Sequence, residues 1–537
     1  MNKGKLALTL SSAAIIGGIT LLSPAGIQTW QRALTGEISF LKDASLGWNA
    51  YWRELSRPYQ PLDQPNYPQY DGIQGLIERG DGCEGYSETY QHLDPNPVQT
   101  ARSQNTTTFS VDVDTASYSN VRRFLNDGQL PPPGAVRVEE MLNYFRYDYP
   151  EPQGEHPLSV TTAMGHCPWE PNKRLLRIGL QARSLDISPP RNLVLLVDVS
   201  GSMSDGDKLP LLRRSLLPWV DQLNENDTLS IVTYAGSSGI TLPPTSGDSK
   251  RQLRRAILNL ESGGSTDGAS GILTAYQLAR EHFEEGAVNR VIIATDGDFN
   301  VGLTSHDDLI KLIESQRASG IYLSVLGLGR GNIDDHLMEQ LADHGNGNYA
   351  YLDSSDEARR VLTQQASSTF LAVADDVKVQ VEFDPALVKS FRQVGYENRQ
   401  MSNSEFDDDR KDAGDLGASQ QVTALYELEL NHGPRPFFPL GELRLRYKLP
   451  GDAESKEVAT ALTEGPPKSQ DFQFQVAVAE MALALQGDGR ASLARALESR
   501  SDLEVEEKPL RREFRSLLKR ASGLRQWSST PVPTGQT

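Results

Sequence analysis

The sequence predicts an α/β protein with a doubly wound, mostly parallel sheet. This sheet is inserted in or flanked by an antiparallel β-sandwich, and a helical region follows at the C-terminus. Between residues 190 and 370, unbroken apolar runs alternate with amphipathic helices, which is typical of a parallel sheet covered on both faces. Residues 371–450 change to a period of two, which indicates antiparallel strands. Helical spacing of apolar residues returns at 469–527.

The α/β region opens with a strand predicted at 193–197, where five apolar residues follow one another without a polar break. A turn at Gly201 leads into a helix predicted at 208–223. A second buried strand at 291–294 also ends in a turn. The remaining expected elements are strands at 229–234, 321–327 and 348–352 and helices at 250–260, 268–283, 307–319, 333–342 and 356–370.

Strand-like segments lie on both sides of the α/β region. Two precede it, at 158–163 and 175–182, and have no partners of their own. The later strands expected at 377–383, 390–396, 422–430 and 443–449 do not complete a sandwich. We expect the two groups to combine into one sandwich, with the α/β domain inserted in one of its loops. Two separate small sheets are the alternative.

At 537 residues the chain is long enough for several domains. The expected parts are a signal peptide or N-terminal anchor at 1–25, a poorly ordered linker at 26–105, a flanking segment with helices and strands at 106–189, the α/β domain at 190–370, a β-rich flanking domain at 371–450, a linker at 451–468, the helical region at 469–527 and a disordered tail at 528–537.

The net charge and the N-terminal sequence indicate which partners the protein has and in which compartment it acts. The net charge of -18 repels nucleic acid, so we expect no nucleic-acid partner. Lys3 and Lys5 precede an apolar run at 6–22, and small residues follow it, which predicts a secretory signal and export to the periplasm or cell envelope. The run is at the lower limit for spanning a bilayer, so an uncleaved anchor that associates with the membrane is the alternative. Cys83 and Cys167 could pair in an oxidising compartment or remain two unrelated thiols.

Five oxygen-bearing side chains follow the predicted strands or lie in a loop between them. Asp198, Ser200 and Ser202 come after the first strand, Thr266 lies in a Gly- and Ser-rich loop, and Asp296 follows the strand at 291–294. Loops beyond the carboxyl ends of parallel strands meet at one edge of the sheet, where ligands bind. Hydroxyls and carboxylates are ligands for hard cations, so we expect a site for Mg²⁺, with Mn²⁺ as the alternative.

These residues resemble the metal-ion-dependent adhesion site (MIDAS) of von Willebrand factor type A (VWFA) domains, whose sheet is Rossmann-like. The resemblance implies a non-enzymatic protein whose bound cation coordinates an exposed Asp or Glu of a protein ligand. Further segments resemble the flanks of a bacterial exported subfamily with an uncharacterised C-terminal domain. The first of these segments begins with FSVDVDTASYSNVRRFLNDGQ at 109–129. The others contain CPW at 167–169 and DFQFQVAVAE at 471–480.

Two other functions are alternatives. One is an envelope scaffold whose metal site is purely structural. The other is a metal-dependent hydrolase, which needs a nucleophile or positioned base and cationic clamps. Lys208 is the nearest cation, and its helical setting predicts a surface position. Asp112 and Asp114 superficially resemble the nucleophile motif of haloacid dehalogenases, but the helices that follow favour a capped strand-to-helix turn.

Overall fold

The computed structural model describes residues 88–185, 189–235, 238–264, 268–297, 306–365, 371–431, 439–463, 470–498 and 508–528. All of them belong to one unit, Cys83–Thr537. The expected signal peptide or anchor at 1–25, Cys83, Thr266 and residues 529–537 lie outside the described residues. Cys167 is buried and forms no disulfide within the described part of the chain. Among the same residues, no helix combines the length and apolar character that crossing a membrane requires.

The α/β domain has a central sheet in which neighbouring strands are parallel, except that the strand at one edge runs antiparallel to its neighbour. In sheet order the strands are β10 (Tyr349–Leu352), β9 (Tyr322–Leu328), β8 (Val288–Thr295), β5 (Arg191–Asp198), β6 (Thr228–Tyr234) and β7 (Ser238–Ser246). Strand β5 occupies an inner position, which explains its unbroken apolar run. Leu193 and Leu195 face one core while Val194 and Leu196 face the other.

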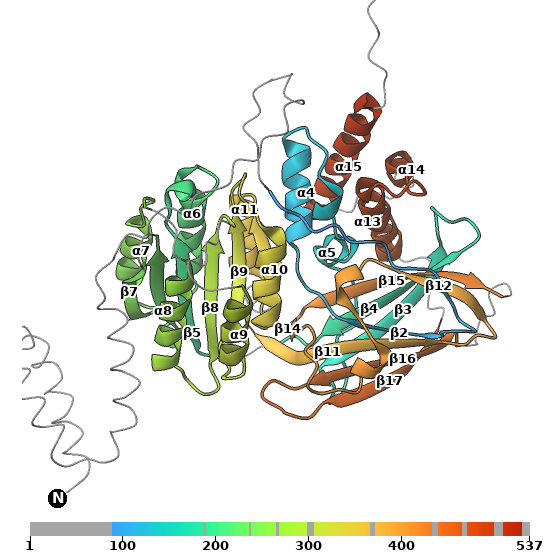
Figure 1. The fold of residues 1–537 in the computed structure, drawn as a ribbon, viewed down its shortest axis with the longest axis horizontal. Coiled ribbons are helices and arrows are strands. Elements are labelled where there is room, and N and C mark those ends of the chain that lie inside the picture. Colours follow the sequence, from blue (N-terminus) through green and yellow to red (C-terminus); the bar gives the residue numbers. More distant parts are fainter. Residues whose placement is uncertain are drawn as a thin grey trace, which may run out of the picture. The chain divides into compact units, whose positions relative to one another are not determined.

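Helices cover both faces of this sheet (Figure 1). On one face lie α6 (Leu209–Val220), α7 (Lys250–Leu258) and α11 (Ser355–Arg359). On the other face lie α8 (Gly268–Glu281), α9 (His306–Arg317) and α10 (Asp335–His344). The doubly wound fold expected from the sequence is therefore confirmed.

Two features of the domain differ from expectation. Strand β7 was not predicted, because it is an edge strand whose residues are largely exposed and which lacks an apolar pattern. The helix expected at 356–370 is helical as far as Gln364 but changes type: α11 ends at Arg359 and one π-helical turn, Arg360–Gln364, follows it. Residues 366–370 lie outside the described residues.

The flanking strands form one sandwich made of two antiparallel sheets. The first contains β1 (Gln99–Thr100), β12 (Val388–Val394), β15 (Gln421–Leu430), β4 (Arg174–Ala182) and β3 (Leu158–His166). The second contains β13 (Gln400–Met401), β2 (Thr106–Ser110), β11 (Ala372–Phe383), β16 (Gly441–Lys448) and β17 (Lys456–Leu462), with β14 (Leu416–Gly417) beside β11.

Strand pairing shows that the α/β domain is inserted in this sandwich. Strand β4 precedes the domain and β15 follows it, yet the two form one ladder that joins Gln181 to Gln421. The inner faces of both sheets share one hydrophobic core. The alternative of two separate small sheets is therefore wrong.

Two segments expected as linkers contribute strands. Residues 99–100, within the expected linker 26–105, form β1 and pair with β12. Residues 456–462, within the expected linker 451–468, form β17 and pair with β16. Both are edge strands, which hydrogen-bond through the backbone and need no continuous apolar sequence.

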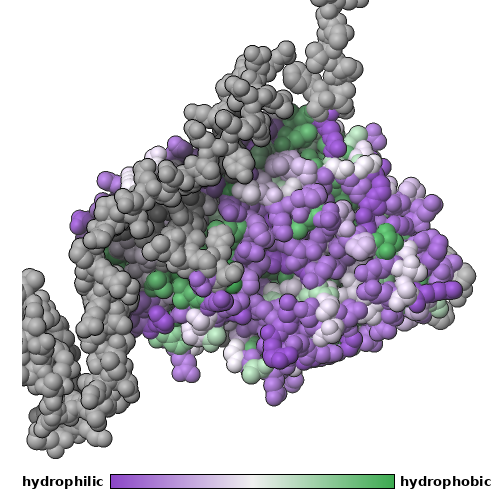
Figure 2. Space-filling model, viewed as in Figure 1, coloured by the Kyte–Doolittle hydropathy of each residue, from purple (hydrophilic) through white to green (hydrophobic). Residues whose placement is uncertain are grey.

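Helices from the two ends of the described chain pack together on the sandwich (Figure 1). They are α4 (Ala116–Asn126), α5 (Val138–Asn143), α13 (Gln470–Gln486), α14 (Leu493–Glu498) and α15 (Pro509–Ser528). Their apolar faces share a core with Ala163, Leu175 and Leu425 of the sandwich. The face shown in Figure 2 is mostly hydrophilic with scattered hydrophobic residues, as the acidic composition leads one to expect.

Candidate metal site at the carboxyl edge of the parallel sheet

Asp198 is the last residue of β5, and its carboxylate is fully buried. Oδ1 accepts a hydrogen bond from the backbone N–H of Ser200 at 2.8 Å. Oδ2 accepts hydrogen bonds from the hydroxyls of Tyr234 at 3.2 Å and Thr295 at 3.3 Å. Both oxygens are thus held in place by groups from β6, β8 and the loop after β5.

The loop after β5 places two hydroxyls beside Asp198. Ser200 Oγ lies 2.9 Å from Ser202 Oγ, and Ser202 is partly exposed to solvent. The loop that leads toward Thr266 is joined to this one, because the N–H of Gly201 donates to the carbonyl of Gly264 at 3.2 Å. Thr266 itself lies outside the described residues. The structure therefore brings Asp198, Ser200 and Ser202 together.

Asp296 directly follows β8, the strand next to β5, and is fully buried. Its Oδ2 accepts a hydrogen bond from Lys208 Nζ at 2.9 Å. The expected surface position of Lys208 is wrong, since the residue is only 3% exposed. Lys208 precedes α6, where backbone angles of φ -114° and ψ -116° turn the chain out of the helical path and allow the side chain to reach Asp296.

The stem of Lys208 passes over Gly329, immediately after β9. Gly329 has φ +72°, and a Cβ at this position would lie 2.2 Å from Lys208 Cγ. The missing side chain therefore makes room for the lysine to reach Asp296.

Replacing Gly329 with alanine is expected to cost about 1–2 kcal/mol through the left-handed backbone alone. The clash with Lys208 adds a further loss, which thermal unfolding measures. Gly286→Ala is a matched control, because Gly286 has φ +80° and open space around it. Equal losses in the two variants would contradict a tightly held Lys208.

The donor set fits a hard divalent cation. Asp198 and Asp296 offer carboxylate oxygens, and Ser200 and Ser202 offer hydroxyls, which are ligands that Mg²⁺ and Mn²⁺ prefer. Burial raises the pKa of Asp198, the hydrogen bonds from Ser200 oppose this, and the nearby Asp296 charge raises it further. A cation that both carboxylates contact would remove this repulsion.

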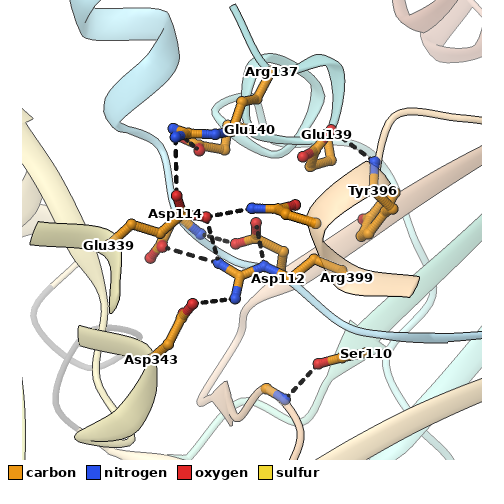
Figure 3. A network of polar contacts seen from close by, with 12 residues as sticks. Ser110, Asp112, Asp114, Arg137, Glu139, Glu140, Glu339, Asp343, Tyr396 and Arg399 are labelled. Carbon is orange, nitrogen blue, oxygen red and sulfur yellow. Dashed lines mark hydrogen bonds and ion pairs between the residues drawn. The ribbon is translucent and has the colours of Figure 1, made fainter. Parts of the chain in front are cut away.

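A second group of carboxylates lies where the α/β domain meets the N-terminal segment (Figure 3). Among the described residues, Asp112, Glu140 and Glu339 place oxygens within 4.8 Å of one another. No local sequence pattern marks this group, because its members come from the β2–α4 connection, α5 and α10 and look like ordinary charges on their own elements. Asp112 and Asp114 form the expected strand-to-helix turn, but no side chain caps α4.

Arginines supply the positive charge in this second group, which we call the acidic junction: Asp112, Asp114, Glu139, Glu140, Asp335, Glu339 and Asp343 with Arg137 and Arg399. Arg137 donates to Glu140 at 2.9 Å and to Asp335 at 2.7 Å. Arg399 donates to Asp112 at 3.1 Å and to Glu339 at 3.0 Å. The carboxylate oxygens of Asp112, Glu140 and Glu339 already accept hydrogen bonds or form ion pairs, so we assign no metal to them. The acidic junction instead joins the α/β domain to the N-terminal segment through opposite charges.

The comparisons with known proteins agree with this architecture. Residues 192–365 match the von Willebrand factor type A domain, residues 84–177 match a family described as von Willebrand factor, and residues 368–439 match the C-terminal family of the uncharacterized protein YfbK. Over 427 residues the chain is 41% identical to the uncharacterized protein YfbK of Escherichia coli (strain K12), covering 74% of each protein. The chain belongs to the YfbK family of von Willebrand factor type A proteins.

Other relatives of this YfbK family member are more distant. It is 27% identical over 329 residues to the uncharacterized protein sll0103 of Synechocystis sp. (strain ATCC 27184 / PCC 6803 / Kazusa), covering 58% of this chain and 76% of that one. A solved structure, von Willebrand factor type A from Catenulispora acidiphila, covers 66% of this chain and 88% of its own at 15% identity, with a TM-score of 0.40.

Proposed function

We propose that this YfbK family member binds a divalent cation, Mg²⁺ or alternatively Mn²⁺, through Asp198, Ser200, Ser202, Thr266 and Asp296. The bound cation then coordinates an exposed Asp or Glu of a protein partner. The observation that supports the proposal most directly is the meeting of two buried carboxylates, from the ends of neighbouring strands β5 and β8, beside the Ser200–Ser202 hydroxyl pair. Membership of the VWFA family supports it further, because these domains commonly bind metal and mediate protein interactions.

The proposed setting is the periplasm or cell envelope. The apolar segment at 6–22 supports export, either with cleavage or as a membrane anchor. The cation holds its ligand at the solvent-facing side of the Ser202 loop, where the hydroxyl is partly exposed. This arrangement suits capture of an acidic side chain on a partner surface.

Asp198→Asn is expected to reduce Mg²⁺ affinity below detection in isothermal titration calorimetry. The amide keeps the shape of the side chain and can still accept from Ser200, but it removes one of two negative charges that attract the cation. Asp221→Asn, which alters an exposed carboxylate on the same domain, is the control and should leave the affinity unchanged. Unchanged affinity in Asp198→Asn would refute the proposed site.

Crosslinking in the native envelope tests the partner. The wild-type protein should crosslink to a partner in Mg²⁺ and lose it in chelator, and Asp198→Asn should not crosslink in either condition. Capture that survives both chelator and the substitution would instead favour a scaffold whose metal is structural.

A further inference from the structure

Lys208 places a positive charge inside the proposed metal site. Its ammonium group lies 2.9 Å from Asp296 Oδ2 and 4.0 Å from Asp205 Oδ2. Asp205 is largely exposed, whereas Asp296 is buried, so the stronger pairing is with Asp296. The stem fits above Gly329, and the contact is therefore part of the packed fold.

The charge of the site changes because of this lysine. Asp198 and Asp296 carry two negative charges when ionised, and Lys208 cancels one of them. A divalent cation that binds beside Lys208 leaves the site with one positive charge in excess. One carboxylate from outside cancels that charge, whereas the same site without Lys208 would be neutral once the cation has bound.

We propose that Lys208 is a tethered cation that weakens divalent metal binding and strengthens the preference of the metal-loaded site for a carboxylate ligand. This inference rests on the proposed function and specifies how that site chooses its ligand. Lys208 competes with the metal for Asp296, so metal enters less readily. After metal binds, the remaining positive charge attracts an anion more strongly than a neutral group.

Lys208→Met and Lys208→Gln test this proposal. Methionine keeps the length of the side chain without the charge, and glutamine also keeps a hydrogen-bond donor for Asp296. Mg²⁺ alone is titrated into each protein by calorimetry, once in sodium chloride and once in sodium acetate at equal ionic strength. Acetate is the carboxylate probe, since a ligand that binds the loaded site raises the apparent metal affinity.

Both variants are expected to bind Mg²⁺ about tenfold more tightly than wild type in chloride, because one repelling charge is gone. Acetate should raise the apparent affinity of wild type and should raise that of the variants less. A residue that merely supports the fold would not produce these opposite changes. Lys389→Met, which removes the same charge from an exposed pair on β12, should behave as wild type.

If wild type binds Mg²⁺ as tightly as both variants or more tightly, the role of Lys208 is overturned and the proposed function stays intact. Metal binding by the variants but not by wild type would overturn the proposed metal function and, with it, the ligand preference assigned to Lys208. Absence of binding in all three proteins would overturn both. If Lys208→Met does not fold, the rise in Tm that Mg²⁺ produces is compared between Lys208→Gln and wild type. A larger rise in Lys208→Gln supports the role of Lys208, and an equal or smaller rise overturns it.

Discussion

Replacing Arg122 with methionine is expected to lower the free energy of unfolding by about 3–5 kcal/mol. Arg122 is buried on α4, and its guanidinium donates to Asp353 at 2.7 Å and to Glu357 at 2.9 Å. It also donates to the Tyr144 hydroxyl at 2.8 Å. Asp353 and Glu357 belong to the last part of the VWFA domain, so the substitution leaves two buried carboxylates short of a cation at a junction between distant segments.

The pH dependence distinguishes this ionic effect from simple loss of packing. Burial raises the pKa of Glu357, but Arg360 and Arg122 together hold it at about 2. A pKa below the ordinary value of 4.5 contributes stability above pH 4.5, and this contribution is lost as the pH falls toward about 2. The difference between wild type and Arg122→Met should therefore shrink as the pH falls below about 4.5.

Urea unfolding followed by circular dichroism measures both effects. Arg254→Met is the control, because Arg254 forms an ion pair with Asp221 in which the side chains are 50% and 45% exposed. Solvent screens this pair, and its removal should leave stability unchanged within error. A loss in Arg122→Met no larger than that of the control would show that the buried contacts do not stabilise the fold.

The wild-type protein is expected to lose stability as the pH rises from about 5 to about 8 because of the acidic junction. Burial raises the pKa of Glu139 to about 8, and repulsion from Glu397 and Asp112 adds to this effect. Burial also raises the pKa of Glu339 to about 7, although Arg137 and Arg399 oppose it. The acidic junction therefore holds protons in the folded protein that the unfolded chain releases.

Stability falls with rising pH because both carboxyl groups have a raised pKa in the folded protein. Each folded-state pKa lies above the ordinary value of 4.5, so the stabilising contribution is complete below pH 4.5 and is lost as the pH rises through about 7 to 8. While the folded state holds one additional proton, the loss is about 1.4 kcal/mol for each pH unit. Within the described residues, Glu139 Oε1 is buried without a hydrogen-bond partner, which is consistent with a protonated group.

Glu139→Gln should make this pH dependence shallower and leave the part that Glu339 contributes. The amide is neutral at every pH and its oxygen can still accept from the Tyr396 backbone N–H, as Glu139 Oε2 does at 2.9 Å. Free energies of unfolding from urea titrations between about pH 5 and pH 8 measure the slope. Glu151→Gln, on an exposed residue, should keep the wild-type slope. A slope in Glu139→Gln equal to that of wild type would contradict the assignment.

Much of the proposed metal site could be predicted from sequence, because its residues occupy recognisable positions at the ends of buried strands. Asp198 and Asp296 meet because β5 and β8 are parallel neighbours, so their carboxyl ends share one edge. Lys208 could not be found in this way. Its inward position depends on an unusual backbone conformation before α6 and on the space left by Gly329, which is more than a hundred residues away along the chain.

The acidic junction, like Lys208, could not be predicted from the sequence. Glu139, Glu140 and Glu339 have the spacing of ordinary helix residues, and nothing local distinguishes them from solvated charges. Their burial follows from the insertion of the VWFA domain in the sandwich, which positions α10 against α5 and Arg399.

The sequence alone determined the buried strands and amphipathic helices of the α/β domain and the strand ends that carry Asp198 and Asp296, because hydrophobic period is a property of neighbouring residues. The tertiary structure decided which strands pair across the insertion, that Lys208 reaches Asp296 and which carboxylates become buried together. These outcomes depend on packing between segments far apart in the chain, which no local pattern records.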